Sequence, residues 1–401
     1  MTASTNPLKQ KIESPSPRRI KELDGFRGVA VLAIVFLHYV VHHYQSVPGT
    51  LPAYAQKYLM WLWVGVDAFF VLSGFLIGGI LLDQRQATNY FQVFYTRRSL
   101  RIFPPYFLLL GCWWMALGLD HSRPGMSWLM EPHFPLWPYL AYLQNFWMAA
   151  NQSIGPLFVA PTWSLAIEEQ FYLLFPLLIR FVPVRNVPQI LLGGILLAPV
   201  LRLACALLGA SWETAQIRLL PTRWDSLLLG ALVAWVVRSP NALGWVTLRP
   251  RLAWGILLGS GGMVALLPFV PNRSGTALSL ATAFGMHLVI AVFFAVALLL
   301  LHLGWMPRVA AALSSRFLCY FGRVSYSVYL LHVPVMGLVF SLLLAKNPDL
   351  VGWVDFCAMT SAFGLTVGLA QLAWWLFERR LIGLGQKLAY RTPMADQSVP
   401  R

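Results

Sequence analysis

Apolar runs of about 20 residues, long enough to cross the hydrocarbon core of a bilayer as helices, recur along the chain between shorter polar segments. They predict membrane spans at about 27–45, 61–82, 104–119, 163–182, 188–208, 223–238, 252–270, 280–303, 323–345 and 353–377. We therefore expect an all-α fold, a polytopic integral membrane helix bundle with about ten transmembrane helices.

Composition agrees with a membrane protein and changes how the charge is interpreted. Of the 401 residues, 58% are hydrophobic and 11% are charged, and the net charge is +15. That is too apolar for a soluble protein of this size. In a soluble chain the charge would suggest nucleic acid, but here Lys and Arg cluster between the apolar runs, as in loops that face an anionic leaflet. Membrane lipids are therefore expected partners, and nucleic acid is not.

The basic residues also predict an orientation. Lys and Arg precede the first predicted span and follow the even-numbered ones, which places both termini in the cytoplasm. We expect a disordered basic cytoplasmic tail over 1–20, a transmembrane domain over 21–380 and a cytoplasmic C-terminal tail over 381–401. The longest opposite-side loop, about 120–162, is rich in Pro and aromatic residues. It is expected to hold a re-entrant or interfacial piece that covers a cavity.

Two ionisable residues mark the first predicted span. Arg27 lies near its start and His38 lies deep inside its apolar run, eleven residues later. Such a pair falls nearly on one helix face, about 16 Å apart along the axis. His38 would lie roughly 10 Å from the outer boundary. An ionisable group at that depth is expected to face a cavity or a partner rather than lipid.

Three carboxylates are predicted at a depth similar to that of His38: Asp67 in the second span, and Glu168 and Glu169 in the fourth. An imidazole beside a carboxylate is a general-base arrangement, because the carboxylate fixes the tautomer and stabilises the imidazolium. Adjacent helical residues point about 100° apart. Only one of Glu168 and Glu169 is therefore expected to face the site, and the sequence does not tell which.

A second group of ionisable residues is cationic and is predicted at the cytoplasmic boundary. It includes Arg27, Arg98 and Arg101, of which the last two are three residues apart and would share a helix face. Paired guanidinium groups suit phosphate. Anchoring by positive-inside loops is the alternative explanation, and it applies above all to Arg97.

Other polar positions in the spans are interpreted as structural. Ser73 and Gly74 are expected to allow close helix packing. Arg202 is expected to neutralise one of the carboxylates, and His332, near the midplane, to line a cavity or serve the structure, with catalysis as the lesser alternative. The cysteines are scattered singly without metal-ligand spacing, so no metal site is predicted.

Six segments in register resemble the acyltransferase 3 family of integral membrane O-acyltransferases. They read LDGFRGVAVLAIVFLHY, GVDAFFVLSGFLI, RRSLRIFPPY, PTWSLAIEEQFYLLFPLL, RWDSLLLGALVAW and GRVSYSVYLLHVPV. The resemblance is to the stand-alone form, without a fused extracytoplasmic hydrolase-like domain. It implies a ten-helix bundle that takes an acyl group, usually acetyl, from cytoplasmic acyl-CoA. The group is placed on a hydroxyl of a glycan or other acceptor.

The resemblance also assigns residues. Arg27 and His38 match the Arg-x10-His motif with its essential His, and Arg98 and Arg101 match the Arg-x-x-Arg pair associated with the CoA phosphates. Asp67, Glu168 and Glu169 match the acidic positions of the motifs.

These residues lead to a functional hypothesis. His38 would deprotonate an acceptor hydroxyl, with Asp67, Glu168 or Glu169 holding its imidazole. Acyl-CoA would be the donor substrate, with no permanently bound cofactor, and the acceptor would be a glycan or a lipid-linked molecule at the bacterial inner membrane. Arg223 and Asp225 could bind the acceptor or pair with other helices. A transporter or flippase of an envelope precursor is the alternative. Acceptor identity, acyl length and oligomeric state stay open.

Overall fold

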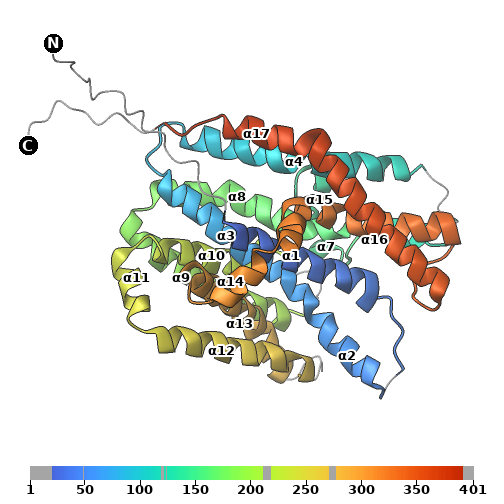
Figure 1. Cartoon of the computed structure of the whole chain (residues 1–401), viewed down its shortest axis with the longest axis horizontal. Coiled ribbons are helices and arrows are strands. Elements are labelled where there is room, and N and C mark those ends of the chain that lie inside the picture. The colour runs from blue at the N-terminus through green and yellow to red at the C-terminus, as the bar shows by residue number, and fades with distance from the viewer. Residues whose placement is uncertain are drawn as a thin grey trace, which may run out of the picture.

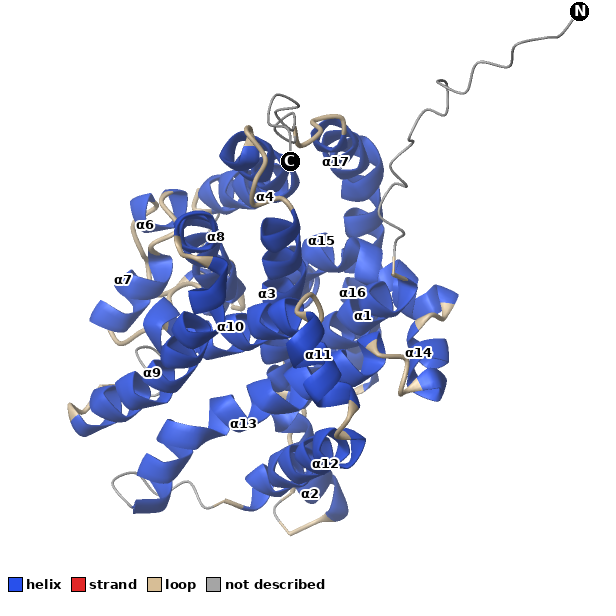
Figure 2. Ribbon diagram, turned by 90° about the vertical axis from the view of Figure 1, so that its left-hand side faces the viewer, coloured by secondary structure: helices blue, strands red, loops and turns tan. Residues whose placement is uncertain are grey.

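The structure is a computed structural model, and it describes residues 20–47, 49–118, 122, 124–210, 218–270 and 277–391. The predicted N-terminal tail, apart from residue 20, and most of the predicted C-terminal tail lie outside the described residues. The described part is helical and contains no strand, as Figure 2 shows. The predicted all-α class is confirmed.

Seventeen α-helices follow one another along the described chain, coloured from blue to red in Figure 1. Their bounds are α1 Lys21–Phe36, α2 Leu51–Leu59, α3 Gly65–Asp83, α4 Tyr90–Ala116, α5 Met126–Met130, α6 Trp137–Leu140, α7 Gln144–Ala150, α8 Trp163–Phe181, α9 Val187–Leu207, α10 Leu220–Val236, α11 Pro240–Thr247, α12 Pro250–Leu266, α13 Ala277–His302, α14 Pro307–Leu313, α15 Arg316–Val339, α16 Trp353–Ala373 and α17 Arg379–Gln386. Single π-helical turns extend α1, α15 and α16 over Leu37–Val41, Phe340–Leu344 and Trp374–Glu378.

Among the described residues, 7 helical segments are long and apolar enough to cross a membrane, or up to 8 if the bent pair α10 and α11 forms one span. The 7 segments are Lys21–Val41, Leu51–Asp83, Val184–Leu207, Pro250–Phe269, Leu280–His302, Arg316–Leu344 and Trp353–Gln386. The predicted third and fourth spans correspond to α4 and α8, which carry several arginines and glutamates. The protein is thus a multi-pass membrane protein, whereas the count of ten and the cytoplasmic termini stay predictions.

Helix α4 is longer than the predicted third span, 104–119, which overlaps its second half. It begins at Tyr90 and runs through Pro104 and Pro105, although proline usually ends a helix. It also contains Arg98 and Arg101, which lie on one helix as predicted. Prolines inside helices are tolerated in membrane proteins because neighbouring groups satisfy the freed backbone.

Helices α1 and α15 pack with their backbones almost in contact. A Cβ added to Gly28 would lie 2.1 Å from the carbonyl oxygen of Leu318, and one added to Gly322 would lie 1.8 Å from that of Asp24. Small residues permit such an approach. Because both helices continue in the same direction from this contact region toward His38 and His332, the contact sets how close these two histidines come.

Helices α3 and α10 meet in the same way. A Cβ on Gly74 would lie 1.8 Å from the carbonyl oxygen of Leu227, and one on Gly230 would lie 1.9 Å from that of Val71. The prediction that Gly74 allows close helix packing is confirmed. Figure 1 shows α1, α3, α10 and α15 together in the middle of the bundle.

The segment between α4 and α8 folds into the short helices α5, α6 and α7. Met130, Tyr139 and Gln144 are fully buried there. The hydroxyl of Tyr106 on α4 donates a 2.8 Å hydrogen bond to the carbonyl of Tyr139. The segment is thus part of the packed interior, and it contributes Trp128 to the wall of a cavity. This agrees with the prediction that it covers a cavity.

Candidate active site

A cavity of about 460 Å³, here called the histidine cavity, opens beside the end of the first span. Its lining residues are Ile34, Leu37, His38, His42, His43, Met60, Trp63, Val66, Trp128, Ile154, Leu157, Ala160, Pro161, Trp163, Arg218, Arg223, His287, Tyr329, Val333 and Met336. Aromatic and aliphatic side chains form most of the wall. The cationic side chains on it are Arg218 and Arg223, and no carboxylate of the described chain lines it.

His38 lies in the π-helical turn that follows α1. Single π-turns inside helices are frequent at functional sites. The Nδ1 atom of His38 lies 2.9 Å from the carbonyl oxygen of Ile34 and 3.2 Å from Nε2 of His332. His332, on α15, is fully buried. Its Nδ1 atom lies 2.6 Å from the carbonyl oxygen of Tyr329.

These contacts determine the tautomers of both rings. A carbonyl oxygen only accepts, so the ring nitrogen that faces one must carry the hydrogen. His332 therefore donates through Nδ1, and its Nε2 is an acceptor. His38 donates through Nδ1 to Ile34 and to His332. The lone pair of a neutral His38 is thus left on Nε2, which has no hydrogen-bond partner among the described residues.

The predicted partnership between His38 and a carboxylate is wrong. Among the described residues, none of the three predicted carboxylates lies within hydrogen-bond distance of His38. Asp67 is fully buried, forms a 2.9 Å ion pair with Arg223, and accepts a 2.9 Å hydrogen bond from the hydroxyl of Ser226. Because α3 packs against α10 here, the side chain of Asp67 points toward Arg223 and Ser226 rather than toward His38.

Glu168 belongs to a second cavity, of about 100 Å³, here called the arginine cavity. Its lining residues are Arg27, Val66, Phe69, Phe70, Ser73, Arg98, Arg101, Ile102, Ser164, Leu165, Glu168, Tyr172, Ser325, Tyr326 and Tyr329. The structure therefore brings together the three arginines predicted to bind phosphate. The hydroxyl of Ser73 donates a 2.7 Å hydrogen bond to Glu168 Oε1. Glu168 is the carboxylate on the wall of this cavity.

The neighbouring residues Glu169 and Arg97 are placed elsewhere. Glu169 lines neither cavity, and its Oε1 atom is buried with no hydrogen-bond partner in the described part of the chain. Glu168 and Glu169 thus point in different directions, as predicted, and Glu168 is the one that faces a cavity. Arg97 donates hydrogen bonds to the carbonyls of Gly385 and Leu388, at 3.2 Å and 2.6 Å. These bonds connect α4 to α17 and to the residues that follow α17.

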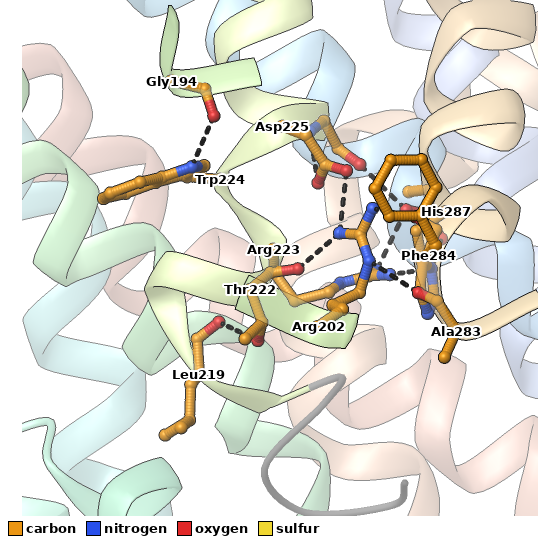
Figure 3. A network of polar contacts seen from close by, with 12 residues as sticks. Gly194, Arg202, Leu219, Thr222, Arg223, Trp224, Asp225, Ala283, Phe284 and His287 are labelled. Carbon is orange, nitrogen blue, oxygen red and sulfur yellow. Dashed lines mark hydrogen bonds and ion pairs between the residues drawn. The ribbon is translucent and has the colours of Figure 1, made fainter. Parts of the chain in front are cut away.

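A buried charge network lies behind the histidine cavity, where α3, α9, α10 and α13 meet. Arg202 and Asp225 form a 2.8 Å ion pair, and both side chains are fully enclosed. Figure 3 shows Arg202 also facing the carbonyls of Thr222 and Ala283, to which it donates at 2.6 Å and 3.2 Å. Arg202 neutralises a carboxylate, as predicted, but the carboxylate is Asp225 and not Asp67, Glu168 or Glu169. Asp225 pairs between helices, which is the structural alternative to acceptor binding.

Arg223 takes part in this network and also reaches the histidine cavity. Its Nη2 atom forms the ion pair with Asp67, and its Nη1 atom contacts Nδ1 of His287. Arg223 and His287 both line the histidine cavity. Of the two predicted acceptor-binding residues, Arg223 lines that cavity and Asp225 does not.

His43 lies just beyond the first span and also lines the histidine cavity. Burial and the neighbouring His42 lower the pKa of His43 to about 4. His43 is therefore neutral near pH 7, and it adds no charge to the cavity wall.

The two cavities adjoin. Val66 and Tyr329 are the residues, among those described, that line both. The Tyr329 hydroxyl lies 2.7 Å from Oγ of Ser164 and donates a 2.9 Å hydrogen bond to the carbonyl of Pro161. Sequence reasoning did not identify Tyr329. The signal available was its position one helical turn before His332, in a segment with family resemblance.

A helical bundle with membrane-spanning segments, a cavity lined by three arginines and an adjoining histidine cavity defines a multi-pass membrane protein with two neighbouring internal cavities. A family model described as an acyltransferase domain matches residues 20–375. The chain therefore belongs to the acyltransferase 3 family. The resemblance noted from the sequence is confirmed.

Two curated relatives resemble most of the chain. O-acetyltransferase OatA of Staphylococcus aureus strain NCTC 8325 / PS 47 is 27% identical over 357 residues, which cover 84% of this chain and 53% of that protein. OatA of strain MRSA252 gives the same values. The chain spans about half the length of these relatives. No solved structure matches the chain.

Proposed function

We propose that this protein is a membrane O-acyltransferase. It moves an acyl group, by default acetyl, from cytoplasmic acyl-CoA to a hydroxyl of a glycan or another cell-envelope acceptor at the bacterial inner membrane. The observation that carries the proposal is the adjoining pair of cavities, one lined by three arginines and the other by His38 with a free Nε2 lone pair. The names of the OatA relatives support the O-acetyl chemistry.

The arginine cavity is the donor site. Arg98 and Arg101 come from one turn of α4, and Arg27 approaches them from α1. Guanidinium groups bind phosphate oxygens in pairs, and three of them suit a ligand with several phosphates, such as CoA. Glu168 provides a negative charge on the same wall, which offsets part of the cluster's positive charge while no anion is bound.

The histidine cavity is the acceptor site. The Nε2 atom of His38 accepts the proton of the acceptor hydroxyl, whose oxygen forms a bond to the acyl carbonyl carbon. The carbon–sulfur bond of the thioester breaks, and the leaving thiolate takes the proton from His38. His332 accepts the hydrogen bond from Nδ1 of His38 throughout, so the reactive lone pair stays on the cavity side. Asp67 acts only indirectly, by holding Arg223 in the wall.

Membranes containing the full chain, radiolabelled acetyl-CoA and isolated cell-envelope glycan provide the test. We expect transfer of label to the glycan and release of free CoA that depends on the glycan. The His38→Ala variant should lose transfer, and the matched control His302→Ala, which changes a histidine outside both cavities, should keep it. Full transfer by a folded His38→Ala variant would contradict the proposal. Movement of an unmodified solute without CoA release would favour a transporter.

A further inference from the structure

We propose that Tyr329 separates the donor cavity from the acceptor cavity, and that it restricts transfer to short acyl groups and keeps acceptor-side water from the thioester. The inference rests on the proposed function, since it assumes that the arginine cavity holds the donor and the histidine cavity the acceptor. Tyr329 would then be a specificity-determining residue of the reaction.

The position of Tyr329 is the first argument. Of the described residues that line the two cavities, only Tyr329 and Val66 line both. A donor bound by the arginines and an acceptor beside His38 therefore lie on opposite sides of this pair. Val66 is a small side chain on α3, whereas Tyr329 on α15 places a large ring at the boundary between the cavities.

The hydrogen bonds of Tyr329 are the second argument. Its hydroxyl reaches α8 and the turn before it, where it contacts Ser164 and Pro161 at 2.7 Å and 2.9 Å. Its carbonyl oxygen accepts the hydrogen bond from Nδ1 of His332. The hydroxyl end of the ring is thus held against α8 and the turn before it, whereas the bond from His332 holds the backbone of Tyr329. We call the contacts of the Tyr329 hydroxyl with Ser164 and Pro161 the latch.

The two cavities differ in volume. The arginine cavity holds about 100 Å³ and the histidine cavity about 460 Å³. Beside Tyr329 the arginine cavity has little room for more than the thioester and a short acyl group of the donor. A longer acyl chain would have to pass the ring and enter the space that the acceptor needs. The ring therefore favours acetyl over longer groups.

Separation of the cavities also limits hydrolysis of the thioester by water. Water in the histidine cavity could be deprotonated by His38 in place of the acceptor hydroxyl, and it would then attack the thioester. Enclosing a reactive group is a general way to prevent such a side reaction. With the latch closed in the absence of acceptor, the thioester is kept from this water.

The experiment compares acetyl-CoA, butyryl-CoA and hexanoyl-CoA as donors, with and without envelope glycan, in membranes of wild type, Tyr329→Ala, Tyr329→Phe and Tyr320→Phe. Removing the ring should raise the rate with hexanoyl-CoA relative to acetyl-CoA by about tenfold, because one methylene in a tight pocket already discriminates by about that factor. Tyr329→Ala and Tyr329→Phe should both raise CoA release without glycan, because each removes the hydroxyl that contacts Ser164 and Pro161. Tyr320→Phe, which changes a tyrosine of α15 outside both cavities, should match wild type.

Unchanged donor preference and unchanged glycan-independent CoA release in an active Tyr329→Ala variant would overturn the inference. If that variant is inactive, Tyr329→Phe decides, because it removes both contacts of the hydroxyl and keeps the ring: wild-type levels of glycan-independent release would overturn the inference. Absence of transfer by the wild-type protein with every donor would instead overturn the proposed function. The two failures are therefore distinguishable.

Discussion

The Nδ1 atom of His38 and the Nε2 atom of His332 lie 3.2 Å apart, across the interface between α1 and α15. The partner that orients the proposed base is thus a second histidine rather than a carboxylate. A neutral imidazole can hold the tautomer of its neighbour through one hydrogen bond, but it offers no negative charge to an imidazolium. His332 is therefore assigned as a positioning residue.

The first prediction concerns this positioning. His332→Phe removes the acceptor for Nδ1 of His38, so the ring can rotate or change tautomer, and kcat should fall by about 100-fold. His332→Gln offers an amide oxygen at a similar reach and should keep kcat within about tenfold of wild type. The KM for acetyl-CoA should change little in both variants, because His332 does not line the arginine cavity.

Steady-state kinetics in membranes, with expression matched by immunoblot, measure both parameters. A merely structural role would lower the amount of folded protein and affect both variants alike. Equal loss of kcat in His332→Gln and His332→Phe would therefore contradict the positioning role.

The second prediction concerns the donor site. Arg98→Lys and Arg101→Lys keep the charge but lose the paired N–H groups of guanidinium. Each should raise the KM for acetyl-CoA by about tenfold, because a charge-assisted hydrogen bond contributes about 1.5–3 kcal/mol. Arg97→Lys is the matched control, since Arg97 bonds the carbonyls of Gly385 and Leu388 outside this cavity. Unchanged KM values in both Arg98→Lys and Arg101→Lys would place the CoA phosphates elsewhere.

The sequence predicted the arginines of this site better than its carboxylates. The arginine cluster could be foreseen because Arg98 and Arg101 share one turn of one helix, and Arg27 was expected at the same depth. The carboxylates could not be assigned, because depth along a helix does not give direction. Asp67 and Glu168 were expected beside His38, yet the first pairs with Arg223 and the second faces the arginines.

The direction in which these side chains point depends on which helices pack against each other. The pattern of hydrophobic and polar residues does not specify those helix pairs. The contact of α3 with α10 at Gly74 and Gly230 turns Asp67 toward Arg223. The contact of α1 with α15 brings His332 to His38, although the two residues are 294 positions apart. The role of His332 and Tyr329 could be seen only once α15 was known to lie against α1.

The third prediction tests the buried ion pair of Arg202 and Asp225. Removing one partner leaves a buried charge uncompensated, which typically costs about 3–5 kcal/mol. Asp225→Leu should therefore strongly lower the thermal unfolding temperature in detergent. The double variant Arg202→Met with Asp225→Leu should recover part of the loss, because no unpaired charge remains. A double variant less stable than Asp225→Leu alone would show that Arg202 stabilises the protein mainly through its bonds to Thr222, Ala283 and Phe284.

The fourth prediction links helix packing to the proposed base. An added Cβ at Gly322 would lie 1.8 Å from the carbonyl oxygen of Asp24, a separation that requires α1 and α15 to move apart. Gly322→Ala should therefore destabilise the protein by about 1–3 kcal/mol, the usual effect of overpacking. The matched control is Gly364→Ala on α16, where an added Cβ meets no atom within 4 Å among the described residues. Since the separation also lengthens the contact between His38 and His332, Gly322→Ala should lose transfer even at temperatures where it stays folded, whereas Gly364→Ala should match wild type. Full transfer by Gly322→Ala would show that the reaction does not depend on the close approach of α1 and α15.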